Sequence, residues 1–209
     1  MARYTDPVCR LCRQIGEKLF LKGERCFTPR CAIDKRRPPP GDKNSMRRRR
    51  VSDRGIQLKE KQKVRYIYGV LERQFRGYLD KAQRGKEVTG LALMQLLETR
   101  LDNVAYRLCF ADSRSQARQT VLHGHLTVNG SKVNIPSYHV KPGDEISWKG
   151  SSASKDFVKE ITEGIPKRPV PNWLALDTST LSGKIVSIPE AEDIDASINT
   201  RLIVEYYSK

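Results

Sequence analysis

The 209-residue sequence lacks any apolar run long enough to cross a bilayer. Its uninterrupted apolar stretches span only a few residues, whereas a transmembrane helix needs about 20. The N-terminus, MARYTDPVCRL, also lacks the apolar core of a secretory signal. We therefore expect a cytoplasmic protein with no membrane partner, whose thiols stay reduced.

The second part of the chain lacks net charge. Residues 86–209 carry 15 Lys and Arg against 15 Asp and Glu, whereas residues 1–85 carry 24 against 9. The formal net charge of +15 therefore lies in the first part, where its field attracts polyanions. Nucleic acid, an anionic membrane and an acidic protein are candidate partners, and the plain alternative is a soluble basic protein. Residues 177–209 are net acidic and should avoid phosphate.

Cysteine is scarce, and four of the five cysteines lie near the N-terminus. Two residues separate Cys9 from Cys12, and four separate Cys26 from Cys31. Two such pairs can supply four sulfur ligands to a tetrahedral metal site. Zn²⁺ and a 4Fe-4S cluster both accept four thiolates, and the spacing does not choose between them. No open ligand position is apparent, so a structural site is expected.

Other interpretations of the cysteines remain open. Disulfides fit a reducing compartment poorly, and no βαβ pattern surrounds the C-x-x-C sequence as in redox proteins. The remaining cysteine, Cys109 in YRLCFA, is typical of a small core residue.

The chain after the cysteines predicts a basic loop and then helices. Residues 35–50, KRRPPPGDKNSMRRRR, combine prolines with repelling charges and are typical of a loop. Ser52 is a candidate cap for a helix that runs to about Tyr68. Further helices are expected over residues 71–84 and 90–108, because apolar residues recur at helical spacing.

Residues 112–148 predict a short helix followed by a small antiparallel sheet. Ser113 and Gln116 form a capping-box pattern, so the helix should begin at Arg114. HLTVNGSKVN predicts a hairpin with a type I′ turn at Asn129-Gly130, and KPGD predicts a type II turn before another strand. Beyond a linker with one short helix, GKIVSIP and RLIVEYY have the composition of strands.

Basic side chains follow one edge of this predicted module. Arg114 and Arg118 are four residues apart and are expected to share the outer face of the helix. His123, His125 and Lys132 follow in the turn and the hairpin. Arginine can bind phosphate through two hydrogen bonds, and histidine can stack on bases. The sequence therefore predicts a nucleic-acid interface here.

Four stretches resemble the family of the fourth protein of the small ribosomal subunit, bacterial type, in its four-cysteine metal-binding branch. They are MARYTDPVCRLC, EKQKVRYIYGVLERQFRGY, ETRLDNVAYRLCFADSRSQARQTVLHGHLTVNGSKVNIPSYHVKPGDEI and LIVEYYSK. The long central motif also occurs in RNA-modifying enzymes and tRNA synthetases. The likeness spans nearly the whole chain, which makes the comparison specific.

The resemblance implies an α+β fold in three parts. A four-cysteine, metal-bound basic arm would occupy residues 1–45. A mostly helical rRNA-binding domain over residues 46–98 would be rejoined by the tail, residues 186–209. An RNA-binding module, a helix-turn-helix-like pair followed by a small antiparallel sheet, would be inserted with its linker over residues 99–185.

The resemblance also implies the function. Family members bind the five-prime domain of 16S rRNA early, nucleate assembly of the body of the 30S subunit and affect translational accuracy. Ribosomal proteins five and twelve, and mRNA where it enters the subunit, are implied as neighbours. Some members repress their own operon by binding its mRNA. No enzyme activity and no small-molecule substrate are implied.

Two sets of site residues follow from these expectations. The metal ligands are Cys9, Cys12, Cys26 and Cys31. The expected RNA-binding residues are Arg3, Arg10, Arg13, Arg36, Arg37, Arg47, Arg48, Arg49, Arg50, Lys59, Lys61, Lys63, Arg65, Arg73, Arg76, Arg114, Arg118, His123, His125 and Lys132.

The chain departs from the family pattern at three places. PPGDKN at residues 39–44 replaces PPGQHG, which changes the side chains that this loop can offer. Cys109 stands where glycine is usual, and Leu71 stands where serine or a similar helix cap is usual.

Two other functions compete with a structural ribosomal protein. A pseudouridine synthase would need a separate catalytic domain with a nucleophilic aspartate, for which the chain has no room. Asp102 and Asp112 are better interpreted as helix-face and loop residues. A zinc-dependent nucleic-acid-binding regulator is the other alternative, and tight RNA-selective binding would exclude it.

Overall fold

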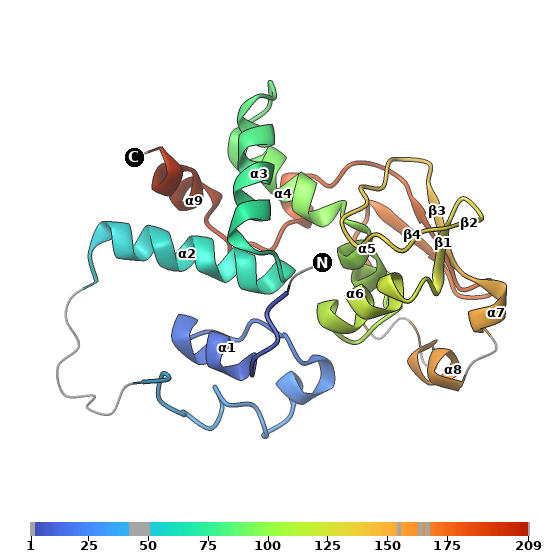
Figure 1. Ribbon diagram of the computed structural model, residues 1–209, viewed down its shortest axis with the longest axis horizontal. Helices are drawn as coiled ribbons and strands as arrows, with labels where there is room; N and C mark the ends of the chain where they lie inside the picture. Colours follow the sequence, from blue (N-terminus) through green and yellow to red (C-terminus); the bar gives the residue numbers. More distant parts are fainter. Residues whose placement is uncertain (1–2, 42–50, 154–155, 163–164, 166–167, 209) are drawn as a thin grey trace. The chain divides into compact units, whose positions relative to one another are not determined.

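The chain forms two compact units, shown in a computed structural model in Figure 1. The structure describes residues 3–41, 51–153, 156–162, 165 and 168–208. One unit comprises residues 1–90 and 196–209, and the other comprises residues 91–195. Helices and one small antiparallel sheet make up the described fold, which confirms the predicted mixture of helices and sheet.

The first unit begins with the arm, which the structure describes over residues 3–41. It contains helix α1 (Cys9–Ile15) and the 3-10 helix η1 (Gly23–Phe27). α1 lies against helix α2 (Asp53–Tyr68). The arm is centred on three buried apolar side chains, those of Leu11, Ile15 and Leu19.

Three further helices of this unit pack together. α2 begins after Ser52, whose hydroxyl accepts a hydrogen bond from the Gly55 N–H, as its sequence predicts. α3 (Glu72–Gln83) confirms the helix expected over residues 71–84, and its buried side chains are those of Phe75, Tyr78, Leu79 and Ala82. The C-terminal helix α9 (Thr200–Tyr207) lies along α2 (Figure 1).

The helix α9 shows that the prediction of a strand over RLIVEYY is wrong. Asn199 caps the helix by accepting a hydrogen bond from the Leu202 N–H at 3.4 Å. Ile203 is fully buried, and the Tyr207 hydroxyl donates to Glu72 Oε1 at 2.6 Å. The strand preference of β-branched and aromatic residues depends on context, and here packing on α2 and α3 outweighs it.

The predicted helix over residues 90–108 is also wrong, because the structure has two helices there. α4 (Thr89–Glu98) and α5 (Leu101–Arg107) are separated at Arg100, whose backbone is extended (φ −68°, ψ 136°). The Leu101 N–H donates to the Tyr138 carbonyl at 2.8 Å. A neighbouring loop thus accepts a hydrogen bond that a continuous helix would form internally.

The predicted capped helix is confirmed in the second unit. α6 (Arg114–Leu122) follows Ser113, whose hydroxyl accepts a hydrogen bond from the Gln116 N–H at 3.3 Å. Gln116 Oε1 in turn accepts a hydrogen bond from the Asp112 N–H at 2.9 Å. The reciprocal bond of the capping box is therefore displaced by one residue.

In the described chain, five strands form one sheet in the order β2-β1-β3-β5-β4. They are β1 (Leu126–Val128), β2 (Ser131–Lys132), β3 (Glu145–Trp148), β4 (Leu174–Asp177) and β5 (Ser182–Ile185). Thr127 pairs with Lys132 across Asn129-Gly130, whose residues both have positive φ, so the predicted hairpin is confirmed. β5 overlaps only the first three residues of GKIVSIP, and β4 was not predicted.

The core of the second unit lies between α5, α6 and the sheet. Its largest member, Trp173, is 1% exposed. The linker expected to hold one helix has two, α7 (Gly150–Ala153) and α8 (Asp156–Thr162), and Val158 of α8 joins the core. A short 3-10 helix, η2 (Ala191–Asp193), follows the sheet. None of the helices described is long and apolar enough to cross a membrane.

Candidate nucleic-acid interface

The four cysteines of the arm are close enough for their charges to interact. Cys12 and Cys26 are buried, whereas Cys9 and Cys31 are half-buried, and all are free thiols. Burial raises the pKa of the Cys12 thiol above its ordinary value, and charge on the other three thiols acts in the same direction. A positive ion among them would have the opposite effect.

The chemistry of this donor set fits a thiophilic metal ion. The Lys22 N–H donates to Cys26 Sγ at 3.4 Å, and such hydrogen bonds stabilise negative charge on sulfur. Within the described residues, however, no group of three or more His, Cys, Asp and Glu side chains is placed to hold a metal ion. The metal-bound arm is therefore not shown and stays a proposal.

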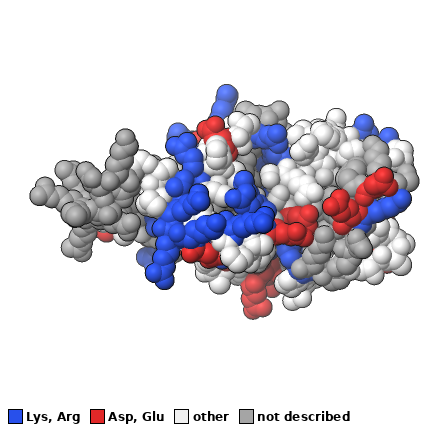
Figure 2. Space-filling model, turned by 90° about the horizontal axis from the view of Figure 1, so that it is seen from below, with Lys and Arg blue, Asp and Glu red and all other residues white. Residues whose placement is uncertain are grey.

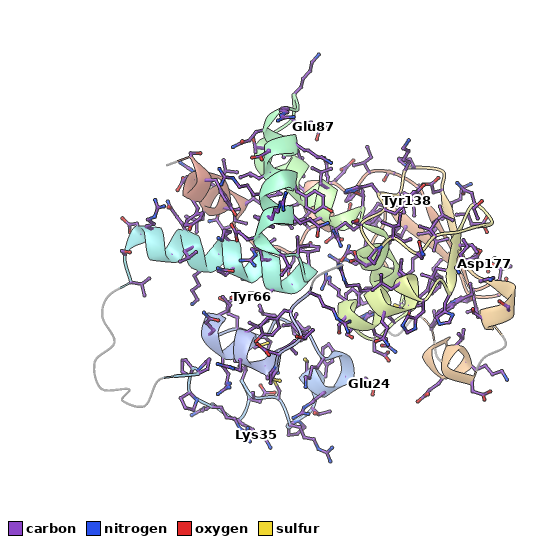
Figure 3. The ribbon with its side chains drawn as sticks, in the orientation of Figure 1. Glu24, Lys35, Tyr66, Glu87, Tyr138 and Asp177 are labelled. Atoms are coloured by element: carbon purple, nitrogen blue, oxygen red, sulfur yellow. The ribbon has the colours of Figure 1, made fainter. Side chains whose placement is uncertain are left out.

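Most of the expected cations of the arm are exposed. The exposed members are Arg3, Arg10, Arg36 and Arg37. Arg13 is half-buried and donates from Nη1 to the Pro38 carbonyl at 2.9 Å. Seen from below, Lys and Arg side chains gather on one face, on the side where the arm lies (Figure 2); Lys35 marks the arm in Figure 3. Arg47 to Arg50 lie outside the described residues, so their contacts stay a prediction.

Two lysines of α2 face the interior, which corrects the expectation that they face RNA. Lys61 is buried and lies 3.0 Å from Glu72 Oε2. Lys63 is buried too, and lies 2.7 Å from both Glu17 Oε2 and the Ser197 carbonyl. These ammonium groups hold α2 to the arm, to α3 and to the segment before α9, and they are withdrawn as RNA contacts.

The other expected cations of α2 and α3 lie nearer the surface. Lys59, Arg73 and Arg76 are exposed. Arg65 is half-buried and forms an ion pair with Glu72 at 2.8 Å. The exposed side chains remain candidates for phosphate contacts.

Arg118 does not lie on an outer face, so that expectation is wrong. It is 5% exposed and lies 2.8 Å from Asp102 Oδ2, which also lies 2.6 Å from Arg100 Nη2. Residues four apart do share a face of α6, but this face lies against α5. The helical spacing showed that Arg114 and Arg118 share a face of α6, but not whether this face points to solvent or to α5.

Arg114 is held in a fixed orientation. Its Nε donates to Asn103 Oδ1 at 2.8 Å, and its guanidinium carbon lies 4.4 Å from the centre of the Tyr106 ring. Both contacts limit the side chain's rotation, and the second is a cation–π interaction. Half-buried Arg114 is therefore held in one orientation.

A polar cluster forms where α6 passes into the hairpin. The rings of exposed His123 and half-buried His125 lie 5.8 Å apart, and His125 Nδ1 lies 2.9 Å from Ser152 Oγ. A Cβ added at Gly124 would collide with the Lys132 side chain, whose Nζ would be 3.0 Å away. The structure therefore brings His123, His125 and Lys132 together, and Ser152 is a partner that the sequence did not reveal.

Comparison with known proteins identifies the family of this chain. Residues 3–98 match the family described as Ribosomal protein S4/S9 N-terminal domain, and residues 99–146 match the S4 domain. Proteins named small ribosomal subunit protein uS4 from Heliobacterium modesticaldum, Citrifermentans bemidjiense and Thermus thermophilus are 54%, 55% and 50% identical over 209 residues, the whole of each chain. The chain belongs to the ribosomal protein uS4 family. The uS4 family consists of ribosomal proteins and not of enzymes.

The sequence did not indicate the structural role of one further arginine, Arg168, in this uS4 family member. Arg168 donates to the carbonyls of Tyr106, Ala111 and Asp112 at 2.7–3.0 Å. Its guanidinium carbon also lies 3.9 Å from the centre of the Tyr106 ring, the ring that Arg114 contacts. A cation in the linker stretch PKRPV carries no sequence signal that separates this role from a solvated one.

Proposed function

We propose that this chain is a cytoplasmic, ribosome-bound structural protein of the small ribosomal subunit that binds 16S rRNA directly. The observation that carries the proposal is its identity of 50–55% with uS4 relatives from end to end. Exposed arginines and lysines on the arm, α2 and α3 support it, because they can donate to phosphates. Arg114, His123, His125 and Lys132 are the proposed contacts of the S4 domain.

The family resemblance supports a more specific role. The chain is proposed to bind the five-prime domain early, to nucleate assembly of the body of the subunit and to contribute to translational accuracy. Its proposed neighbours are ribosomal proteins five and twelve, and mRNA where it enters the subunit. Repression of its own operon through mRNA binding belongs to the same proposal.

Sedimentation of the chain in cell extracts tests the ribosomal role. An affinity-tagged copy should migrate with small-subunit particles on a sucrose gradient and remain with them after a high-salt wash. A tagged basic protein of similar size and pI, without family resemblance, controls for nonspecific charge. Recovery with chromosomal DNA, or in the free fractions alone, would favour a nucleic-acid-binding regulator.

We also propose that Cys9, Cys12, Cys26 and Cys31 hold Zn²⁺, with a 4Fe-4S cluster as the alternative. A bound metal would cross-link two short segments of the arm and so stabilise its fold. The interacting thiols and the hydrogen bond to Cys26 Sγ support this proposal.

Metal analysis of anaerobically purified protein tests the four-cysteine site. One zinc per chain without colour fits Zn²⁺, whereas iron with sulfide and a brown chromophore fits the cluster. Cys26→Ser should lower the metal content, and Cys109→Ala should leave it unchanged because Cys109 lies in the other unit. Metal-free protein with intact RNA binding would contradict the proposal.

A further inference from the structure

Two phenylalanine rings form an exposed aromatic pair on the arm. Phe27, the last residue of η1, is 69% exposed, and Phe20 is 39% exposed. Their ring centres lie 5.1 Å apart and their planes differ by 26°, so the rings are stacked. Neither ring belongs to the buried centre of the arm, and burying them would remove substantial apolar area from water.

The backbone holds this pair in position. Phe20 has φ +50°, a left-handed conformation that is unfavourable for a bulky side chain. Phe27 directly follows Cys26, which is buried and bonded through its sulfur to the Lys22 N–H. Strained backbone that the surrounding structure maintains tends to cluster at ligand-binding sites.

Cations flank the aromatic pair in the sequence. Lys22, Arg25 and Arg30 are exposed, and residues 3–41 carry ten Lys and Arg against four Asp and Glu. Unpaired RNA bases stack on aromatic side chains while neighbouring phosphates contact cations. The combination of an exposed ring face with excess positive charge therefore fits RNA better than an apolar protein surface.

We propose that Phe27, backed by Phe20, is a stacking platform for an unpaired base of the bound RNA. This inference rests on the proposed function and adds a base contact to the phosphate contacts. Phe27 supplies the accessible ring face, and Phe20 limits its rotation from the other side. The contact is tolerant of base identity, because every base has an aromatic face.

Substitutions at Phe27 separate stacking from charge. Phe27→Ala should weaken binding to a 16S five-prime-domain transcript by about 5- to about 150-fold, the range for one stacked base. Phe27→Leu, apolar but without a ring, should resemble Phe27→Ala, and Phe27→Tyr should retain most of the affinity. Val88→Ala is the matched control, because Val88 is an exposed apolar residue of the same unit, 76% accessible.

Two further readouts protect the test from a folding artefact. Heparin, a polyanion without bases, should bind wild type and Phe27→Ala equally well. Phe27→Trp places an indole at the proposed contact, and the transcript should quench its fluorescence more than that of Val88→Trp. The native Trp148 and Trp173 are buried and give a common background.

The outcomes distinguish the stacking proposal from the proposed function. Selective transcript binding that all Phe27 variants retain would overturn the stacking platform and leave the proposed function standing. Equal loss of heparin and transcript binding would also overturn it, because Phe27 would then act through the fold. A wild-type chain that does not prefer the transcript would overturn both.

Discussion

Asp102 is a buried carboxylate of the second unit that lies between two arginines. It is 4% exposed, and Arg100 and Arg118 beside it are 0% and 5% exposed. Its Oδ2 atom lies 2.6 Å from Arg100 Nη2 and 2.8 Å from Arg118 Nη1. Charges at this depth are tolerated only when paired and hydrogen-bonded, so the three residues depend on one another.

Asp102→Asn should therefore destabilise the chain strongly. The amide keeps the shape but removes the negative charge that both buried guanidinium groups contact, and breaking such a buried pair costs about 3–5 kcal/mol. Urea unfolding followed by circular dichroism measures the change. Asp80→Asn, on the exposed side of α3, should change stability by no more than about 0.5 kcal/mol. If Asp102→Asn and Asp80→Asn had the same urea midpoint of unfolding, the stabilising role of the buried Asp102 ion pairs would be contradicted.

Individual residues show what the sequence could predict and what it could not. The apolar flanks of Cys109 predicted a buried cysteine, and it is 2% exposed. Its φ is +62°, a conformation that glycine adopts most easily, which agrees with the glycine that the family resemblance implied there. The inward direction of Arg118 could not be predicted, because it depends on Asp102 in another helix.

At the scale of helices, α3 lacks a side-chain cap. Leu71 has the extended backbone of an N-cap residue (φ −81°, ψ 158°) but offers no hydrogen-bond acceptor from its side chain. Leu71→Ser should supply one and raise the free energy of unfolding by about 1 kcal/mol relative to Leu71→Ala. Chemical denaturation of both variants tests this, and equal stability would show that α3 gains nothing from a cap.

Glu72, the first residue of α3, connects α2 with α9. It accepts hydrogen bonds from the Tyr207 hydroxyl at 2.6 Å and from Lys61 Nζ at 3.0 Å. Burial alone would raise the pKa of Glu72, but these bonds and the charges of Lys61 and Arg65 outweigh it and hold the pKa below its ordinary 4.5. The stability that Glu72 contributes is therefore present above pH 4.5 and is lost as the pH falls through its lower folded-state value.

The stability difference between wild type and Glu72→Gln should follow this pH dependence. It should be constant from neutral pH down to about 4.5 and then narrow, because protonated Glu72 resembles glutamine. Urea unfolding at a series of pH values measures it. Glu87→Gln, at an exposed position in the same unit (Figure 3), is the control. A difference that persists unchanged in acid would contradict the assigned ion pairs.

Element boundaries were predicted well where local signals set them. Ser52 and Ser113 cap helices as expected, and Asn129-Gly130 forms the expected turn. The break between α4 and α5 could not be predicted, because Leu97, Leu101 and Val104 keep helical spacing through it.

At the scale of the whole molecule, the positive charge of the first 85 residues is expected to dominate RNA affinity. Replacing Arg47 to Arg50 with alanine should reduce the slope of log affinity against log salt by about 0.7–0.9 for each lost phosphate contact. The matched control replaces four cations of residues 86–209, whose charges sum to zero, namely Lys141, Lys159, Lys184 and Arg201. An unchanged slope in the first variant would show that its arginines are merely solvated.

Local sequence patterns did not indicate how each unit is assembled from distant segments, although the family resemblance implied that residues 186–209 rejoin the helical domain. Glu145 of β3 pairs with Lys184 of β5, so a segment about 40 residues further along the chain continues the sheet. The tail forms α9, which packs against α2. Composition predicted the basic surface and its polyanionic partner, but pairings between segments so far apart depend on three-dimensional packing that local patterns do not record.

The most direct test of direct rRNA recognition is an affinity measurement on the purified chain at physiological salt. It compares a 16S five-prime-domain transcript with a transcript of equal length from another rRNA domain and with duplex DNA. Specific recognition predicts the tightest binding to the first, by about a thousandfold or more. Equal affinity for all three nucleic acids would contradict it and leave only charge attraction.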